Sequence, residues 1–358
     1  MAPNQGLQDF SGAVAGHPGT MADKHNCIFV KPCTSAEAGF YETARNEHPE
    51  FSELMPEWMG NLNLSDMHRI ETEGLDAVIT KDGKIKTGSD QIAATVAEQA
   101  APQAWQPKGT GKKIKTDSAI ILDNSLHGFK KPNILDCKLG VRLWADDAPD
   151  AKKERFSKIT EETTHKNFGF RIAGMKVFRG SEDASELNAD GYKVYDKDFG
   201  RKSVNDENLV DTFRRFVFNK AAGIDDDLAR AICELFARDV ATVEDVLSRH
   251  ESRMYSASLL FVFEGDGAAL RRAIKVNQAA GEDEEQEVDR AATNRRIDSG
   301  IGLEAGDNDE DDEPELPPVY TLKLIDFAHA EFTPGQGPDE NSLLGVRSLK
   351  NIFNELAQ

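Results

Sequence analysis

Residues 131–140 read Lys-Pro-Asn-Ile-Leu-Asp-Cys-Lys-Leu-Gly and say more about this chain's architecture than any other stretch. On a β-strand, Asp136 and Lys138 share a face because they are two residues apart. A carboxylate and an ammonium on one face can orient a hydroxyl and neutralise a phosphate, which phosphoryl transfer requires together with a metal ion. From spacing alone, an ordinary salt bridge on a strand is the more common explanation.

Toward the C-terminus, residues 324–330 read Leu-Ile-Asp-Phe-Ala-His-Ala. An aspartate at the end of an apolar strand, here Asp326, is well placed to hold Mg²⁺, which takes hard oxygen ligands and few of them from protein. The following phenylalanine is similar to the Asp-Phe-Gly of protein kinases. His329 could contact a substrate phosphate. The simpler alternatives are a turn residue for Asp326 and a packing or capping role for His329.

Toward the N-terminus, residues 14–19 read Val-Ala-Gly-His-Pro-Gly and precede a predicted strand, residues 27–31, that carries Lys31. A kinase N-lobe covers nucleotide phosphates with a glycine turn before a strand bearing a lysine. Glycines near a flexible chain terminus would explain the same pattern.

Apolar periodicity predicts the other elements. Further strands are expected at residues 118–122, 168–178, 257–264 and 319–327. Helices are expected from residue 36, capped by Ser35, and at residues 205–218, 225–238 and 242–255. Residues 91–101 could form an Ala-rich helix, and residues 103–115 read as a basic loop. The last two strands flank an acidic excursion, so they are expected to form a hairpin with an inserted loop.

The formal net charge of −20 is unevenly distributed. Residues 280–316 hold 15 acidic and 3 basic residues and lack apolar periodicity. Most of the insertion from about residue 265 to 318 is therefore predicted to be disordered. The rest of the chain is close enough to neutral to hold a local basic pocket. The acidic balance argues against direct nucleic-acid binding.

The 358 residues, 39% of them hydrophobic, permit one large domain or two lobes around a cleft. No apolar run approaches the roughly 20 residues of a membrane helix, and the N-terminus lacks the pattern of a secretory signal. A soluble intracellular monomer is expected. The four cysteines match no common zinc spacing and are expected to be reduced thiols.

These segments together resemble the inositol polyphosphate kinases. Pro132-x-x-x-Asp136-x-Lys138-x-Gly140 is similar to a motif that is highly specific to that family. Four further segments resemble it in the expected order, namely residues 14–17, 169–176, 258–260 and 325–329, and the closing residues 338–349 are also similar. The resemblance covers the chain from about residue 12 to its end.

The resemblance implies an α+β, two-lobed, kinase-like fold with ATP in the cleft between the lobes. It implies a disordered stretch at residues 1–11, an N-lobe at 12–126 and a C-lobe at 127–358.

In this fold, Lys31 would contact ATP phosphates, and Asp123 and Ser125 would belong to the hinge that holds adenine. Asp136 would orient or deprotonate the attacking hydroxyl, Lys138 would reach both the transferred phosphate and the substrate, and Asp326 would bind the Mg²⁺ that accompanies ATP.

The substrate is expected to meet the basic run at residues 150–162. On a helix, Arg155 and Lys158 are three residues apart and share a face, and Lys152 lies three residues before Arg155. Clustered cations suit a ligand that carries three or more phosphates. Without the resemblance, a solvated helix face is the simpler interpretation.

Within the family, residues 163–176 and the turn at 333–335 look most like the fungal multikinases. The implied reaction is phosphorylation of inositol 1,4,5-trisphosphate to the tetrakis- and then the pentakisphosphate. Only 29 residues lie between Gly140 and Phe170, less than the helical insertion of trisphosphate-restricted kinases needs. Trisphosphate-restricted and hexakisphosphate kinases are kept as alternatives.

A second class of function is an interaction protein that uses the kinase fold as a scaffold and binds transcription regulators through the acidic stretch. A tolerated loop is the preferred interpretation of that stretch, because long insertions cost little closure entropy. A protein kinase is disfavoured because the chain lacks His-Arg-Asp and Ala-Pro-Glu segments. The resemblance implies residence in the nucleus and cytoplasm.

Overall fold

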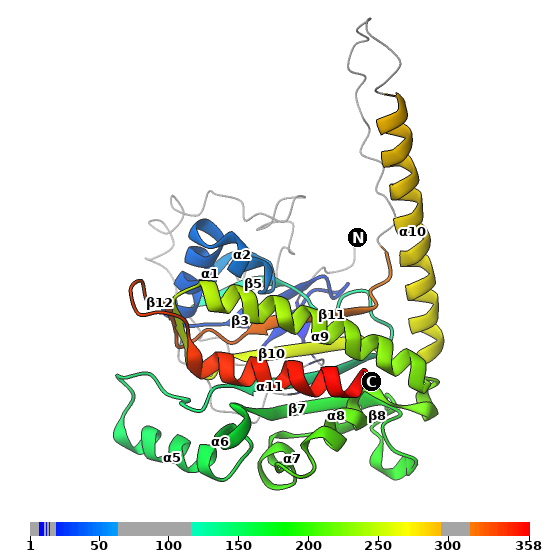
Figure 1. Ribbon diagram of the computed structural model, residues 1–358. Helices are drawn as coiled ribbons and strands as arrows, with labels where there is room; N and C mark the ends of the chain where they lie inside the picture. The colour runs from blue at the N-terminus through cyan, green and yellow to red at the C-terminus, as the bar shows by residue number, and fades with distance from the viewer. Residues whose placement is uncertain are drawn as a thin grey trace, which may run out of the picture.

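The computed structural model describes residues 7–10, 12, 14, 19–63, 116, 118–294 and 316–358, with the backbone alone for 281–294. Within these residues, two five-stranded antiparallel sheets form the centres of two lobes (Figure 1). The predicted α+β, two-lobed architecture is confirmed. No helix in the described part of the chain is long and apolar enough to span a membrane.

The sheet of the N-lobe has the strand order β1-β2-β3-β5-β4. Its strands are β1 (Gln8–Asp9), β2 (Met21–Ala22), β3 (Ile28–Pro32), β4 (Trp58–Asn63) and β5 (Ser118–Asp123). Lys31 lies on β3, paired with Ile120 of β5. Two helices follow β3, namely α1 (Ser35–Glu47) and α2 (Pro49–Glu53). The cap of α1 is Thr34 rather than the predicted Ser35, because the Thr34 side chain accepts the Glu37 N–H.

The sheet of the C-lobe has the order β11-β10-β6-β7-β8, which puts the strand of residues 131–140 in its centre. Its strands are β6 (Pro132–Leu139), β7 (Phe170–Phe178), β8 (Tyr192–Tyr195), β10 (Ser258–Glu264) and β11 (Tyr320–Ile325). β10 and β11 pair antiparallel from Ser258↔Ile325 to Phe263↔Tyr320, which confirms the predicted hairpin. A small sheet pairs β9 (Ser252–Met254) with β12 (Ala330–Phe332).

Helices cover the C-lobe sheet (Figure 1). The long pair α9 (Asp226–Arg249) and α11 (Glu340–Leu356) lies across one face, next to α8 (Leu209–Val217). At the lower edge in Figure 1 lie α5 (Asp150–Glu161), α6 (His165–Phe168) and α7 (Lys197–Lys202). Two short 3₁₀ turns, Ala184–Glu186 and Lys220–Ala222, complete this lobe.

The predicted break between residues 238 and 242 is wrong, since α9 runs unbroken from Asp226 to Arg249. Its buried residues Ile232, Phe236, Val240, Val243 and Leu247 recur at intervals of three or four, so one apolar stripe continues across the expected boundary. No glycine or proline interrupts this stretch.

The predicted disorder is wrong over residues 267–294, which form α10 (Gly267–Asn294). Leu270 and Ala273 are buried at helical spacing against the C-lobe, and the Asp266 carboxylate accepts the N–H groups of Ala268 and Ala269. An N-terminal cap and an anchored first turn therefore start a helix that continues into the acidic region. In Figure 1, α10 projects away from the lobes.

Disorder at residues 1–11 was predicted as well, and it is wrong for residues 8 and 9, which form β1 against β2. The helix expected at 91–101 and the basic loop expected at 103–115 lie outside the described residues. Within the expected glycine turn, the structure describes Val14 and Gly19 but not residues 15–18.

The position directly after β6 requires a glycine, both for its backbone conformation and for lack of space. Gly140 has φ +96°, and a Cβ there would lie 2.5 Å from Asn341 Nδ2. Asn341 Oδ1 accepts the N–H groups of Val141 and Arg142 at 2.9 and 2.8 Å. The turn after β6 therefore fixes the end of the central strand to the start of α11.

We expect Phe236→Ala to lower the free energy of unfolding by about 3–5 kcal/mol, because a large ring is lost from a close-packed core. Phe236 is fully buried and contacts the rings of Phe261 and Phe353. Denaturant unfolding monitored by circular dichroism measures the change. Val276→Ala, on a side chain 44% exposed, is the control and should stay within about 0.5 kcal/mol of the unchanged protein. Equal effects of the two substitutions would contradict this account of the core.

Candidate active site

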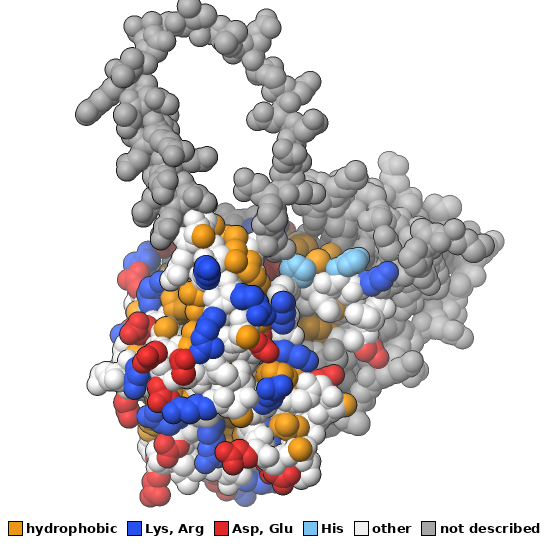
Figure 2. All heavy atoms as spheres, turned by 90° about the vertical axis from the view of Figure 1, so that its right-hand side faces the viewer, with side chains coloured by type: hydrophobic (Ala, Val, Ile, Leu, Met, Phe, Trp, Pro, Cys, Tyr) orange, Lys and Arg blue, Asp and Glu red, His pale blue; other side chains and the backbone are white. Residues whose placement is uncertain are grey.

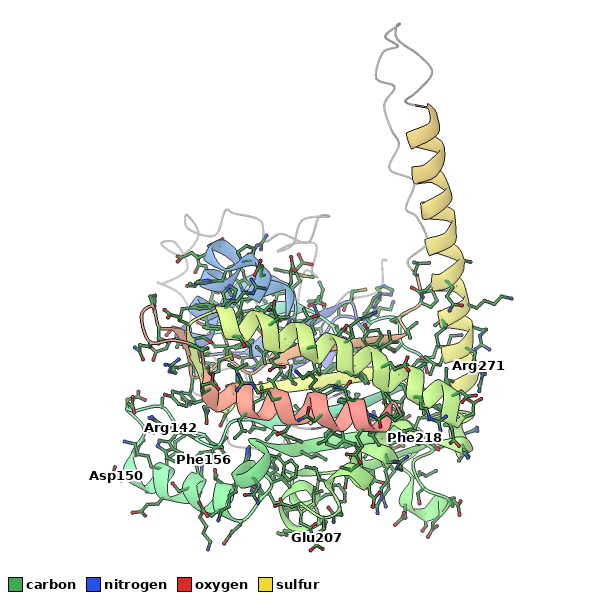
Figure 3. The ribbon with its side chains drawn as sticks, in the orientation of Figure 1. Arg142, Asp150, Phe156, Glu207, Phe218 and Arg271 are labelled. Atoms are coloured by element: carbon green, nitrogen blue, oxygen red, sulfur yellow. The ribbon has the colours of Figure 1, made fainter. Side chains whose placement is uncertain are left out.

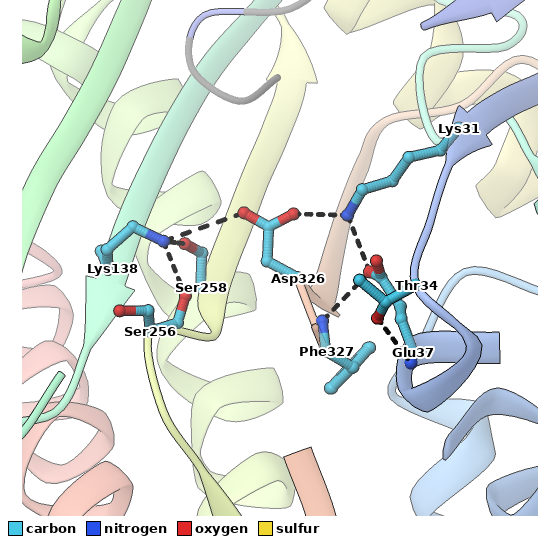
Figure 4. A network of polar contacts seen from close by, with 8 residues as sticks. All are labelled: Lys31, Thr34, Glu37, Lys138, Ser256, Ser258, Asp326 and Phe327. Atoms are coloured by element: carbon cyan, nitrogen blue, oxygen red, sulfur yellow. Dashed lines mark hydrogen bonds and ion pairs between the residues drawn. The ribbon is translucent and has the colours of Figure 1, made fainter. Parts of the chain in front are cut away.

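A chain of charged side chains joins the two lobes (Figure 4). Lys31 Nζ of β3 lies 2.8 Å from Glu37 Oε1 of α1 and 2.7 Å from Asp326 Oδ1, just after β11. Glu37 Oε1 also accepts the N–H of Phe327 at 3.2 Å. Burial lowers the pKa of Lys31, but Asp326 and Glu37 more than offset this, so the pKa is raised and the lysine stays charged. The interlobe contact is therefore a preformed ionic cluster.

On the other side of Asp326 stands Lys138 (Figure 4). Its Nζ lies 3.8 Å from Asp326 Oδ2 and donates to the carbonyl of Ser256 at 2.6 Å. Asp326 and Ser256 both have positive φ, 69° and 66°. Non-glycine residues in this region are uncommon and strained, and such strain often marks functional sites. The backbone is held so that one carboxylate lies between two lysines.

Asp136 lies two residues before Lys138 on β6 and is 4% exposed. Its Oδ1 is buried and has no hydrogen-bond partner among the described residues. Burial raises the pKa of Asp136 to about 6, against the opposing pull of Lys138. The carboxylate thus exchanges its proton nearer to neutral pH than an exposed aspartate does.

A mostly apolar cavity, the hinge cavity, lies between the lobes. Its walls include Phe29, Tyr41 and Leu122 of the N-lobe and Ile134 and Leu260 of the C-lobe. Asp123, Asn124, Ser125 and Leu126 close one side, where the chain leaves β5. The Asn124 N–H donates to the carbonyl of Cys27 at 2.9 Å, which fixes this connection against the turn before β3.

A second hollow, the cationic cavity, adjoins the first. The two share Val14, Lys31, Asp136 and Asp326. Basic side chains from separate elements line it, namely Lys31, Lys138, Lys152, Arg171, Lys197, Arg201 and His329. Phe156 is part of its wall, and Figure 3 shows it on the side of α5 that faces the lobe. The catalytic candidates therefore stand where an apolar and a cationic cavity meet.

Arg171 and Arg201 are two cations held in the cationic cavity with unused donors. The Nε atoms of both are buried and lack a hydrogen-bond partner among the described residues. Burial and then the charge of Arg201 lower the pKa of Arg171 to about 10. Two guanidinium groups that repel each other and keep free donors provide a strong site for an anion.

The family model for inositol polyphosphate kinase matches residues 119–354. The chain belongs to the inositol polyphosphate kinase family. Membership makes it a kinase and confirms the family predicted from the motifs.

Two relatives differ in how much of their length they share with this kinase. The inositol polyphosphate multikinase of Saccharomyces cerevisiae is 29% identical over 95% of each chain. Inositol hexakisphosphate kinase 1 of Rattus norvegicus is 29% identical over 71% of this chain and 55% of its own length. Among solved structures, the S. cerevisiae multikinase Ipk2 in complex with ADP and Mn²⁺ aligns with a TM-score of 0.57 and 24% identity, over 93% of this chain and 100% of the other. That likeness supports the fold.

The structure brings together most of the residues predicted for the site. Lys31, Asp136 and Asp326 line both cavities, Asp123 and Ser125 line the hinge cavity, and Lys138 and His329 line the cationic cavity.

His329 belongs to the cationic cavity as an uncharged ring. Its Nε2 lies 3.1 Å from Lys152 Nζ. Burial and then Lys152 lower the pKa of His329. A neutral imidazole beside an ammonium can accept a hydrogen bond from it, so His329 holds the Lys152 ammonium at the cavity wall.

The structure does not bring Arg155 and Lys158, the residues predicted to contact the substrate, together with the rest of the site. Both lie on α5, but both are exposed and neither lines the cationic cavity. The Arg155 guanidinium lies 5.0 Å from the Phe156 ring, and Lys158 Nζ lies 3.7 Å from Glu162 Oε1. On this helix the cavity-lining residues are Lys152, Phe156 and Ile159, spaced four and three apart. Arg155 and Lys158 therefore lie on the solvent-exposed face of α5.

Sequence reasoning missed Glu37 and gave no role to Arg171, Lys197 or Arg201. Glu37 had a visible signal, since Thr34-Ser-Ala-Glu37 fits the capping-box pattern. Its side chain, however, reaches Lys31 and the Phe327 N–H. The two arginines and Lys197 lie on β7 and α7, so only the fold brings them to the residues of β6.

Asp136→Asn should stabilise the fold at pH 8 while removing catalysis. The folded-state pKa of about 6 lies above the ordinary 3.8, so the native carboxylate costs stability above pH 6, and this cost disappears as the pH falls below about 4. The difference corresponds to as much as about 3 kcal/mol.

Denaturant unfolding at pH 8 and pH 4 measures this effect. Glu154→Gln, on an exposed residue of α5, is the control and should change stability at neither pH. An Asp136→Asn variant that is no more stable than the unchanged protein at pH 8 would show that the carboxylate is not disfavoured by burial.

Proposed function

We propose that this kinase transfers the γ-phosphoryl group of ATP to inositol polyphosphates, converting inositol 1,4,5-trisphosphate to the tetrakis- and then the pentakisphosphate. One observation carries the proposal. Lys31, Asp136 and Asp326 form the wall shared by an apolar cavity and a cationic one. A nucleotide in the first and a polyphosphate in the second would meet at these three side chains.

The hinge cavity suits adenine. Its apolar walls would sandwich a base, and the backbone of residues 123–125 would offer edge hydrogen bonds. Lys31 would then reach the phosphates from β3. Its ion pair with Glu37 matches the lysine–glutamate pair that protein kinases require in the active state.

The residues present fit a divalent metal ion that accompanies ATP. Among the described residues no cluster of three or more His, Cys, Asp or Glu side chains could hold a metal by itself. Mg²⁺ in kinase sites takes one or two carboxylates and completes its shell with phosphates and water. Asp326, in the wall shared by the two cavities, supplies such a carboxylate. When bound, the ion would neutralise charge on the transferred phosphoryl group.

Asp136 and Lys138 would act on the substrate side. A carboxylate whose pKa is about 6 can accept the proton of an attacking hydroxyl near neutral pH. Lys138, fixed by the Ser256 carbonyl and near the Ser258 hydroxyl, would hold the phosphoryl group during transfer. Because Asp326 lies between Lys138 and Lys31, both lysines would be positioned before the substrate arrives.

The cations of the cationic cavity would hold the substrate's own phosphates. Lys152, Arg171, Lys197 and Arg201 come from three elements and surround an open space. Such a wall suits a ring with several phosphates better than one with a single phosphate. The S. cerevisiae multikinase matches over nearly its whole length, whereas the rat hexakisphosphate kinase shares 55% of its own. This difference supports the multikinase reaction.

The proposal is tested by incubating the purified protein with Mg-ATP and inositol 1,4,5-trisphosphate and separating the products by anion-exchange chromatography. We expect tetrakis- and pentakisphosphate from the unchanged protein and neither from Asp136→Asn, because the group that accepts the proton is lost. Tetrakisphosphate alone would indicate a trisphosphate-restricted kinase. Product only when inositol hexakisphosphate replaces the trisphosphate would indicate a hexakisphosphate kinase. A folded protein with no product would favour the scaffold.

Arg201→Gln should raise the KM for the inositol phosphate at least about tenfold, since a hydrogen bond to a charged group contributes about 1.5–3 kcal/mol. The double variant Arg155→Gln, Lys158→Gln removes twice the charge from the solvent face of α5 and is the control. Its KM should stay within about twofold of the unchanged value, because exposed charges contribute little. Steady-state kinetics that separate kcat from KM measure both. A larger effect of the double variant would indicate that Arg155 and Lys158 contact the substrate, as the sequence predicts.

A further inference from the structure

Three cations gather around two aromatic rings at the end of the C-lobe sheet that carries β8. Lys131 Nζ lies 5.2 Å from the ring centre of Phe178 and 5.9 Å from that of Tyr192. Lys176 Nζ lies 4.2 Å from the Tyr192 ring, and the Arg179 guanidinium carbon lies 5.3 Å from the Phe178 ring. The two rings pack edge to face at 5.5 Å. We call these five residues the edge cluster.

No carboxylate among the described residues forms an ion pair with Lys131, Lys176 or Arg179. Two carboxylates, Glu264 and Asp190, lie close enough to act on the cluster without forming an ion pair in it. Glu264 accepts the backbone N–H groups of Lys130, Lys131 and Asp266 through its two oxygens. Asp190 acts on Lys176 at longer range, and it raises the pKa of that lysine less than burial lowers it. The three cations thus outnumber the carboxylates of Glu264 and Asp190 beside them, and none of the three is in an ion pair among the described residues.

This crowding is unfavourable for the protein alone. Burial lowers the pKa of Lys176 most, the Asp190 carboxylate opposes this, and repulsion by Lys131 lowers the pKa further, so the charged form of Lys176 is disfavoured on balance. Arg179 has φ 49°, a conformation that costs a non-glycine residue free energy. In a chain with a net charge of −20, three neighbouring cations that form no ion pair among the described residues are conspicuous. An anion bound there would relieve the repulsion.

The available contacts restrict the ligand's chemistry. Phe178 and Tyr192 are 7% and 4% exposed, so their rings lie beneath the cations and cannot stack on a ligand. What remains outward are ammonium and guanidinium donors. A guanidinium offers paired donors that match phosphate oxygens, and two neighbouring ammonium groups favour a ligand with more than one charge.

The edge cluster is separate from the active site. Lys131 and Asp136 are five residues apart on or beside β6, and Lys176 and Arg171 are five residues apart on β7. At about 3.3 Å per residue, the two places lie about 17 Å apart along the strands. One small ligand in the cationic cavity cannot reach both.

We propose that the edge cluster is a second, non-catalytic binding site for a compact anion carrying two or more phosphate groups. Figure 2 views the side of the molecule that includes β8 and the base of α10, where Lys and Arg side chains extend down the middle of the face and acidic ones lie mainly toward its left and lower edges. Basic side chains are thus present on this face, interspersed with acidic ones.

The test measures the acylation rate of individual lysines in the full-length protein, with and without inorganic tripolyphosphate. N-hydroxysuccinimide acetate modifies the amines, mass spectrometry of peptides locates them, and sodium chloride matches the ionic strength. At a tripolyphosphate concentration about ten times Kd, acylation of Lys131 should slow about tenfold, because one site in about eleven stays empty. Exposed Lys275 on α10 should be unaffected.

Two variants make the result specific. Arg179→Gln removes one exposed cation of the edge cluster, and it should weaken protection of Lys131 at least about tenfold in concentration. Arg272→Gln, an exposed cation on α10, should leave it unchanged. Protection at Lys152 and Lys197 reports the cationic cavity separately, so failure of the proposed kinase site would be visible by itself. Unprotected Lys131 in the folded protein, or protection that Arg179→Gln leaves intact, would overturn the second site.

Discussion

The active site depends on one carboxylate held between two lysines that belong to different lobes. Asp326 contacts Lys31 of the N-lobe at 2.7 Å and faces Lys138 of the C-lobe at 3.8 Å. Glu37 balances the second positive charge and also holds the backbone at Phe327. Removing one member of a buried ion pair costs several kcal/mol, because its partner keeps an unmatched charge. The relative position of the lobes at the cleft is therefore coupled to the residues that would handle phosphate.

The sheet explains why this cluster tolerates a long excursion in the chain. Asp136 and Lys138 come from central strand β6, and Asp326 follows β11, which pairs with β10 next to β6. The connection from β10 to β11 includes α10, which projects away from the lobes (Figure 1). The entropy of closing a loop grows slowly with its length, so strand pairing and not the connection sets the position of Asp326.

The sequence predicted the strands that carry the site better than the walls around it. Asp136, Lys138 and Asp326 were found because each lies in a short local pattern, two residues apart on a strand or at a strand end. Arg171, Lys197 and Arg201 meet only after β7 and α7 pack beside β6, which no local spacing reports. The helix α5 was predicted correctly, but Lys152 lines the cavity whereas Lys158 lies on the exposed side. The sequence does not show which side of this helix the lobe covers. Disorder was predicted for residues 267–294 because acidic residues are frequent there. The prediction did not consider that buried Leu270 anchors the first turn of a helix.

Charge segregation explains how an acidic chain maintains cationic sites. Of the 15 acidic residues at positions 280–316, six lie at positions 282–289, on the part of α10 that projects from the lobes. Interactions between charges more than about 8 Å apart are largely screened at physiological salt, so acidic positions on a helix that leads away from the lobes do little to neutralise lysines and arginines of the body. Because α10 projects from the lobes, it places these acidic positions farther from the cationic cavity than a loop folded back on the lobes would. The net charge of the chain and the sign of its binding surfaces can therefore differ.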